Sequence, residues 1–244
     1  MHAPLPYVLP VEMLLLAYRS GVFPMADARD DEELFWVEPR ERAIIPLDGL
    51  HVSRSLAKVI KQDRFAMTVN RDFAAVIRAC AAPRPDHPDT WISDRIEKSY
   101  IALHETGHAH SVECWLDGEL VGGLYGVSFD RAFCGESMFS RADNASKVAL
   151  AWLVALMRRA GFRLLDCQFL TGHLSSMGAR TVSRDEYLQL LAAAAREGGE
   201  ADLPGAYQAL LAEVDANQAL LEEARSDQPS SPGKLIAQSL TQTS

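Results

Sequence analysis

The chain has 244 residues, of which 48% are hydrophobic and 23% are charged, a composition typical of soluble globular proteins. This length is sufficient for one large domain or two small ones, each with a buried core. The longest apolar stretch, Val148–Met157, is far shorter than the roughly 20 residues that a membrane-spanning helix requires. The first ten residues lack the basic and apolar regions of a signal peptide. These features exclude a membrane-spanning helix and predict a cytoplasmic protein.

The formal net charge of −9 is unevenly distributed along the chain. From Glu197 onward there are eight acidic residues and two basic ones, so the first 196 residues carry a net charge of only −3. A local basic patch on this part of the chain is therefore compatible with the acidic total, and a nucleic-acid partner is not excluded. The candidate residues for such a patch are Arg54, Lys58, Lys61, Arg64 and Arg71.

In the first half of the chain, helical apolar spacing over Val11–Ser20 ends at Gly21, a common residue at helix C-termini. The segment Ala43–Leu47 predicts a short edge strand, because Pro46 cannot donate a hydrogen bond to a neighbouring strand. Ser53–Gln62 predicts a basic helix that begins at a capping serine. The other predicted elements of this half are a strand at Phe65–Val69 and helices at Arg71–Ala81 and Ile96–Glu105.

In the second half, an Asp117-Gly118 turn between Ala109–Leu116 and Glu119–Ser128 predicts a β-hairpin. The elements predicted after it are a helix at Asn144–Ala160, a strand at Phe162–Leu170, helices at Arg184–Arg196 and Leu203–Ala224, and a linker at Ser226–Gly233. This mixture of helices, hairpins and a buried strand predicts the α+β class with a mixed central sheet. We expect a small N-terminal domain at 1–62, a catalytic domain at 63–196 and an acidic C-terminal extension at 197–244.

The densest group of reactive side chains lies in Phe133–Arg141 and Asn144–Lys147. These segments place an acid, three hydroxyl groups, an amide and two cations among bulky apolar residues, between a hairpin strand and a long apolar helix. We expect the polar groups at the C-terminal end of a strand pair, where mixed sheets tend to hold ligands.

Asp166 and Gln168 form a second candidate site in the predicted buried strand. Residues two apart in a strand share one face, so the carboxylate and the amide are expected side by side, with Leu165 and Cys167 on the other face. Polar groups on an inner strand are costly unless they are paired or used. The pair is therefore either a structural hydrogen bond or part of a functional site.

Two motifs in the sequence are misleading. His104-Glu-Thr-Gly-His108 matches the HExxH zinc signature, but Gly107 predicts that the helix ends before His108. The two histidines would then not share a helix face, and we expect no bound metal. Arg158–Gly161 resembles part of an acetyltransferase pyrophosphate loop, yet it lies at the end of a helix, whereas phosphate binding needs the N–H groups of a helix start. The four cysteines contain no CxxC pair and are expected to be reduced, buried thiols.

Taken in order, many segments resemble the leucyl/phenylalanyl-tRNA–protein transferases, from about Leu14 to Tyr187. The matching segments are Tyr18–Pro24, Phe35-Trp36, His51–Ser55, Thr90–Ser93, Leu103–Glu113, Leu120–Gly126, Cys134–Arg141, Asn144–Lys147 and Leu165–Gln168. The resemblance implies transfer of Leu or Phe from aminoacyl-tRNA to proteins with N-terminal Arg or Lys, marking them for degradation. It also implies an acetyltransferase-like (GNAT-type) core, no cofactor and a monomer.

The same resemblance implies roles for individual residues. Asp166 is the candidate base or electrostatic anchor, Gln168 orients the reacting groups, and Glu136 fixes the amine or the cationic side chain of the acceptor. Trp36 and Trp91 match positions near the terminal adenosine of the tRNA, where stacking contributes about 1–3 kcal/mol per base. The residues expected to line an apolar pocket for the Leu or Phe side chain are Leu124, Phe133, Gly135, Met138 and Leu165.

Two other classes of function are compatible with the residues. One is an acetyl-CoA-dependent N-acetyltransferase, against which the lack of a Gly-rich loop at a helix start argues. The other is a non-catalytic adaptor that binds N-terminal Arg or Lys and leaves aminoacyl-tRNA intact.

Overall fold

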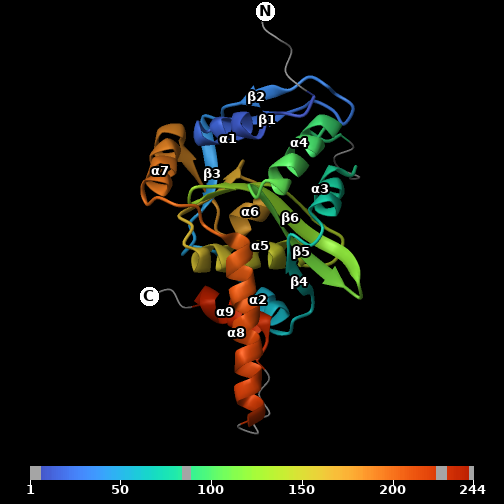
Figure 1. The fold of residues 1–244 in the computed structure, drawn as a ribbon, viewed down its shortest axis with the longest axis vertical. Helices are drawn as coiled ribbons and strands as arrows, with labels where there is room; N and C mark the ends of the chain where they lie inside the picture. Colours follow the sequence, from blue (N-terminus) through green and yellow to red (C-terminus); the bar gives the residue numbers. More distant parts are fainter. Residues whose placement is uncertain (1–6, 84–88, 224–229, 242–244) are drawn as a thin grey trace, which may run out of the picture.

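A seven-stranded mixed sheet forms the centre of the computed structural model, which describes residues 7–83, 89–223 and 230–241 (Figure 1). The strand order is β4-β5-β6-β7-β8-β3-β9, and neighbouring strands are antiparallel except β7 and β8, which are parallel. The strands are β3 (Glu41–Ile45), β4 (Ala66–Val69), β5 (Ala109–Leu116), β6 (Glu119–Phe129), β7 (Ala132–Ser140), β8 (Leu164–Gln168) and β9 (Arg180–Ser183).

Helices cover both faces of this sheet and create two apolar cores. Figure 1 shows α5 crossing beneath the sheet, with α2, α8 and α9 beyond it, and α1, α3, α4 and α7 on the other side. The helices are α1 (Val11–Arg19), α2 (Arg54–Lys61), α3 (Phe73–Ala81), α4 (Asp94–Glu105), α5 (Ala145–Ala160), α6 (Gly172–Ser176), α7 (Arg184–Arg196), α8 (Leu203–Glu223) and α9 (Pro232–Thr241). None of these helices is both long enough and apolar enough to cross a membrane. The predicted α+β class is confirmed.

The small N-terminal part consists of α1 and a separate two-stranded sheet, in which β1 (Phe23–Met25) pairs with β2 (Phe35–Val37). Strand β3, which the sequence assigned to a domain of residues 1–62, belongs instead to the large sheet. The expectation of an edge strand there was wrong, since β3 lies between β8 and β9. The proline argument did not apply, because β3 ends at Ile45 and Pro46 follows it.

The segment Phe133–Arg141 was expected after a strand pair, but most of it is strand β7 in the middle of the sheet. Its apolar residues explain the difference: Phe133 packs into the core on the α5 side, whereas Cys134 packs into the core on the opposite side. The polar residues of this segment therefore lie within the sheet. The predicted hairpin turn is confirmed, with φ of 52° at Asp117 and 84° at Gly118.

The HExxH residues do not share a helix face. Helix α4 ends at Glu105, and Gly107 adopts a φ of 85°, so His108 lies beyond the helix as the sequence predicted. The ring of His104 stacks on Phe73 with a centroid distance of 4.4 Å, and its Nδ1 lies 2.8 Å from the carbonyl oxygen of Ala109. His104 thus has structural partners, and the two histidines lack the geometry of the zinc signature.

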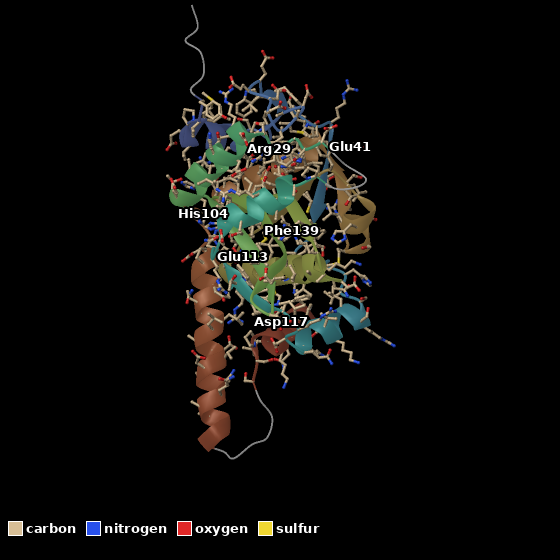
Figure 2. The ribbon with its side chains drawn as sticks, turned by 90° about the vertical axis from the view of Figure 1, so that its right-hand side faces the viewer. Arg29, Glu41, His104, Glu113, Asp117 and Phe139 are labelled. Carbon is tan, nitrogen blue, oxygen red and sulfur yellow. The ribbon has the colours of Figure 1, made fainter. Side chains whose placement is uncertain are left out.

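The acidic C-terminal extension packs against the body through two helices. Helix α8 packs on α5 and runs past the end of the body, and α9 packs on α2 and α5 (Figures 1 and 2). The hydroxyl of Tyr207 donates to the carbonyl oxygen of Met67 at 2.9 Å, and the amide of Gly233 donates to Asp63 at 2.7 Å. Helix α9 was missed, because part of it was read as the linker Ser226–Gly233, whose first four residues lie outside the described ranges.

We expect α9 to be required for full stability. Ile236 is fully buried between α9 and the body, so Ile236→Ala should lower the free energy of unfolding by about 2–4 kcal/mol through lost burial and a residual cavity. The matched control is Leu220→Ala on α8, whose side chain is 63% exposed and should change stability by less than about 0.5 kcal/mol. Urea unfolding followed by circular dichroism measures both. Equal stabilities of the two variants would contradict a tightly packed α9.

Candidate active site

The parallel strands β7 and β8 separate at the centre of the sheet. They pair only from Ala132 and Leu164 to Cys134 and Asp166, although β7 continues to Ser140. Beyond this point, each strand has a β-bulge of one extra residue. The bulge in β7 is at Glu136, where the register with β6 shifts, and the bulge in β8 is at Cys167, where the register with β3 shifts. Such bulges bend a strand and redirect side chains, and they are frequent next to active sites. The two bulges therefore lie where β7 and β8 stop pairing and the sheet opens between them.

A pocket of about 690 Å³ occupies this opening. Its walls come from both sides of the sheet, with Leu150 and Leu153 from α5 on one side and Met25, Ala79 and Trp91 on the other. The volume lies within the usual range for sites that bind small ligands, about 300–1,000 Å³. Figure 2 labels Phe139, another lining residue, in the middle of the body. The pocket thus lies between the two apolar cores and is lined mainly by apolar side chains.

Glu136 is the acidic residue that faces this pocket in the described part of the chain. Its side chain is almost fully buried, Oε1 accepts a hydrogen bond from Gln168 Nε2 at 2.8 Å, and Oε2 accepts one from Tyr100 at 3.3 Å. Burial raises the pKa of Glu136 to about 7, although hydrogen bonds from Tyr18 and Gln168 oppose this shift. Glu136 can therefore exchange a proton near neutral pH, as a catalytic acid or base requires.

Asp166 is fully buried behind the pocket rather than in its wall. Arg42 donates to both of its oxygens, with Nη2 at 2.6 Å from Oδ2 and Nε at 3.1 Å from each oxygen. The hydroxyl of Tyr187 donates to Oδ2 at 2.9 Å, and the backbone amide of Gln168 donates to Oδ1 at 2.8 Å. These donors occupy the lone pairs of the carboxylate, so Asp166 has no free acceptor directed at the pocket.

Arg42 is held as firmly as its partner. Its guanidinium lies between the rings of Phe23 and Tyr187, with centroid distances of 4.7 and 4.5 Å, and Nη1 donates to the carbonyl oxygen of Gly21 at 3.1 Å. Burial opposes the charge of Arg42, but the Asp166 carboxylate outweighs this effect and raises the pKa of the guanidinium. The result is a fully buried ion pair in which each of the three guanidinium nitrogens donates at least one hydrogen bond.

Gln168 connects the buried pair to the pocket. Its backbone has a φ of 60°, a left-handed conformation that is uncommon for a residue other than glycine. The side chain of Gln168 lines the pocket and holds Glu136, while its backbone amide is bonded to Asp166. The sequence correctly placed Asp166 and Gln168 in one strand, and the structure connects them directly.

Seven of the predicted site residues line the pocket, namely Trp91, Leu124, Gly135, Glu136, Met138, Leu165 and Gln168. Three do not. Asp166 lies behind the wall, and Phe133 packs fully buried against Phe162 in the core. Trp36 is 38% exposed on β2 and pairs in register with Pro24, whereas Met25, the next residue of β1, lines the pocket.

Several lining residues were missed by the sequence analysis. They are apolar or weakly polar side chains from segments whose position could not be read locally, namely Met25, Phe139, Leu150, Leu153, Phe169 and Leu174. Leu150 and Leu153 lie in a helix that is buried along almost its whole length, so apolar spacing does not distinguish core from pocket. Met25 lies in a strand of only three residues, too short to show alternation.

Together, the fold and the site define an α+β enzyme whose pocket combines apolar walls with a buried carboxyl group that titrates near neutrality. The family model for "Leucyl/phenylalanyl-tRNA protein transferase" matches residues 44–192, and the model for its N-terminal domain matches residues 8–40. The chain belongs to this family of aminoacyltransferases.

Individual relatives agree with this assignment. The chain is 54% identical to the leucyl/phenylalanyl-tRNA–protein transferase of Novosphingobium aromaticivorans, over 98% of each protein. It is 61% identical to that of Rhizorhabdus wittichii, over 74% of this chain and 73% of the relative. It is 58% identical to that of Zymomonas mobilis, over 75% of this chain and 68% of the relative. The two family models end before the C-terminal extension, which the first relative matches almost completely.

Proposed function

We propose that this protein transfers leucine or phenylalanine from aminoacyl-tRNA to the α-amine of proteins that begin with Arg or Lys, and thereby marks them for degradation. The observation that carries the proposal is the pocket between β7 and β8, in which apolar walls meet the titratable carboxyl of Glu136. An aminoacyl ester is already activated, so the enzyme mainly has to align an amine with a carbonyl group.

The apolar part of the pocket is suited to the side chain of the transferred amino acid. Leu124, Met138 and Leu165 contribute to it, and the flexible thioether of Met138 can adapt to the different shapes of Leu and Phe. Trp91 lies at the same pocket and is available to stack on the terminal adenosine of the tRNA. Trp36 does not line the pocket, so we assign the contact with the terminal adenosine to Trp91 alone.

In the proposed reaction, the neutral α-amine of the acceptor attacks the ester carbonyl carbon. Glu136 accepts a proton from the amine nitrogen as the C–N bond forms. The bond between the carbonyl carbon and the ribose oxygen of the tRNA then breaks, and the proton passes to that oxygen. An N-terminal amine has a pKa near 8, so about a tenth is neutral at pH 7. The carboxyl group of Glu136, with a pKa of about 7, is well matched to accepting a proton from this amine.

We assign Asp166 the role of electrostatic anchor rather than general base. Its oxygens already accept hydrogen bonds from Arg42, Tyr187 and the amide of Gln168, and it is fully buried. A base must reach the proton that it removes within hydrogen-bond distance, directly or through one water. Glu136 lies in the pocket wall and meets this requirement better.

The exposed cations of α2 and of the loop after it provide a surface for the phosphates of the tRNA. Arg54, Lys58, Lys61 and Arg64 are all exposed in this region. Phosphate contacts of this kind supply affinity without reading sequence. We further propose that the enzyme acts as a monomer in the cytoplasm.

The separation of β7 and β8 supports an acetyltransferase-like core, as the sequence resemblance implied. Two neighbouring parallel strands, connected by the crossover helix α5, pair briefly and then diverge around a ligand pocket. Ligands commonly bind beyond the carboxyl ends of such parallel strands. The proposal therefore joins the GNAT-type architecture to an aminoacyl-tRNA donor in place of acetyl-CoA.

The deciding experiment is transfer of labelled leucine from Leu-tRNA to a peptide that starts with Arg, beside one that starts with Ala. Label on the Arg peptide alone would support both the reaction and the acceptor rule. If the Arg peptide bound but the Leu-tRNA stayed intact, the protein would be an adaptor. If neither peptide were labelled but acetyl-CoA acetylated the Arg peptide, the N-acetyltransferase alternative would replace the proposal.

A further inference from the structure

A continuous chain of hydrogen bonds leads from the interior of the protein to the pocket. Arg42 and Tyr187 both donate to Asp166, whose Oδ1 accepts from the backbone amide of Gln168. The side-chain amide of Gln168 then donates to Glu136 at 2.8 Å. Arg42 and Tyr187 themselves do not line the pocket, so they can influence the reaction only indirectly, and this chain of hydrogen bonds connects them to Glu136.

The backbone of Gln168 is the strained part of this chain of hydrogen bonds, because its φ is 60°. A left-handed conformation at a residue with a side chain costs about 1–3 kcal/mol and persists only when its surroundings enforce it. The bond from the Gln168 amide to Asp166 helps to hold this backbone in place, together with the pairing of Gln168 with Ala43 on β3. Asp166 can serve as a fixed acceptor only because Arg42 and Tyr187 occupy its outer lone pairs and prevent the carboxylate from rotating.

We propose that Arg42 and Tyr187 are positioning residues, which fix Asp166 and thereby hold Gln168 in the conformation that directs Glu136 at the substrate. The three elements involved are distant in sequence: β3 carries Arg42, β8 carries Asp166 and Gln168, and α7 carries Tyr187. Neither Arg42 nor Tyr187 was a predicted site residue, because neither lies in the polar segments around Glu136 and Asp166. The inference rests on the proposed transferase reaction, since it concerns the same Glu136.

Tyr187→Phe is the mildest test, because it removes only the hydroxyl, which donates to Asp166 and accepts from Arg42 Nη2 at 3.3 Å, and keeps the ring that stacks on Arg42. We expect kcat for leucine transfer to fall about tenfold while the KM for Leu-tRNA changes less than about twofold, since the apolar pocket is untouched. The matched control is Tyr207→Phe, which also removes one buried hydroxyl bond, to the carbonyl oxygen of Met67 on β4, and should keep the wild-type kcat.

Arg42→Lys gives the stronger effect. Lysine keeps the charge but lacks the planar fork that contacts both oxygens of Asp166, so we expect kcat to fall about 100-fold. In Arg42→Ala, added guanidinium ions should restore part of the activity by occupying the vacated space, whereas sodium chloride at equal ionic strength should not. Failure of guanidinium to restore activity in a folded Arg42→Ala protein would contradict the positioning role.

A readout without substrate separates this inference from the proposed function. Native-state hydrogen exchange of the Gln168 backbone amide should become faster in Tyr187→Phe and Arg42→Lys but not in Tyr207→Phe. If the wild-type protein failed to transfer leucine, the proposed function would fall and the exchange rates would still test the positioning chain. Wild-type exchange at Gln168 together with wild-type kcat in Tyr187→Phe would overturn the inference.

Discussion

Glu136→Gln is expected to reduce leucine transfer by a factor of about 10²–10⁴ at pH 7.5, the usual contribution of a positioned general base. Glutamine keeps the size of the side chain and an oxygen that can accept from Gln168 Nε2, but it cannot take up a proton. The effect should appear in kcat and not in the KM for Leu-tRNA, because the apolar walls of the pocket are unchanged. Single-turnover transfer to an Arg peptide measures it directly.

Glu113→Gln is the matched control for this prediction. Glu113 is another fully buried glutamate with a raised pKa caused by burial, but it lies on β5 and accepts hydrogen bonds from Thr68 and Ser111 outside the pocket. The transfer rate per folded molecule should stay at the wild-type level. An equal loss in both variants would show that burying any neutral amide in the sheet disturbs the site, and the assignment of Glu136 would fail.

The pH dependence of the wild-type rate should carry the signature of Glu136. Because the carboxylate form accepts the proton, kcat/KM should increase as the pH rises through about 7, the pKa of Glu136. The acceptor amine adds a second increase near pH 8. In Glu136→Gln the lower increase should disappear while the increase near pH 8 remains, and a profile that kept both would contradict the role of Glu136.

The raised pKa of Glu136 also predicts that the site lowers the free energy of unfolding at neutral and alkaline pH. The folded protein keeps the proton on Glu136 up to pH 7, whereas the unfolded chain loses it near pH 4.5. Since the folded state binds more protons in this window, the free energy of unfolding falls as the pH rises from 4.5 to 7, by about 3 kcal/mol for this group. Glu136→Gln should therefore be more stable than the wild type at pH 8 and approach it at pH 5.

The sequence identified most of the chemistry of the site but not its geometry. Glu136, Asp166 and Gln168 could be found because polar residues within apolar strands are unusual. Their arrangement could not, since it depends on the bulges at Glu136 and Cys167, which arise from pairing with β6 and β3. A bulge is a property of two strands in register, and a single strand read alone does not show it.

The partners of Asp166 show the same limit. Arg42 lies 124 positions away in sequence, and nothing in its local context distinguishes it from an arginine on the surface. The predicted strand began only at Ala43, whereas β3 begins at Glu41 and includes Arg42. The side chain of Arg42 is buried between the rings of Phe23 and Tyr187. Helix α9 was overlooked for a related reason, because its apolar face is defined by contact with α2 and α5.

Asp166→Asn should be among the most destabilising single changes in this protein, with a loss of about 3–5 kcal/mol in the free energy of unfolding, because it leaves the buried charge of Arg42 without its partner. The matched control is Glu197→Gln, which removes the same kind of charge from exposed pairs with Arg131 and Arg163 and should change the free energy of unfolding far less. Denaturant unfolding at pH 7.5 measures both, and a small loss for Asp166→Asn would contradict a buried ion pair whose two charges depend on each other.

Stability and activity can be separated at this pair. Replacing both charges in Arg42→Met/Asp166→Leu removes the unpaired ion, so stability should return towards the wild-type level, as is observed when buried ion pairs are exchanged for apolar residues. Transfer should stay low, because Gln168 has lost the acceptor of its backbone amide. If Asp166 is an anchor, the residual activity of Asp166→Asn should also keep the wild-type increase through pH 7, whereas a flattened profile would make Asp166 the base. The buried pair is then retained for the conformation of Gln168 rather than for the stability of the fold.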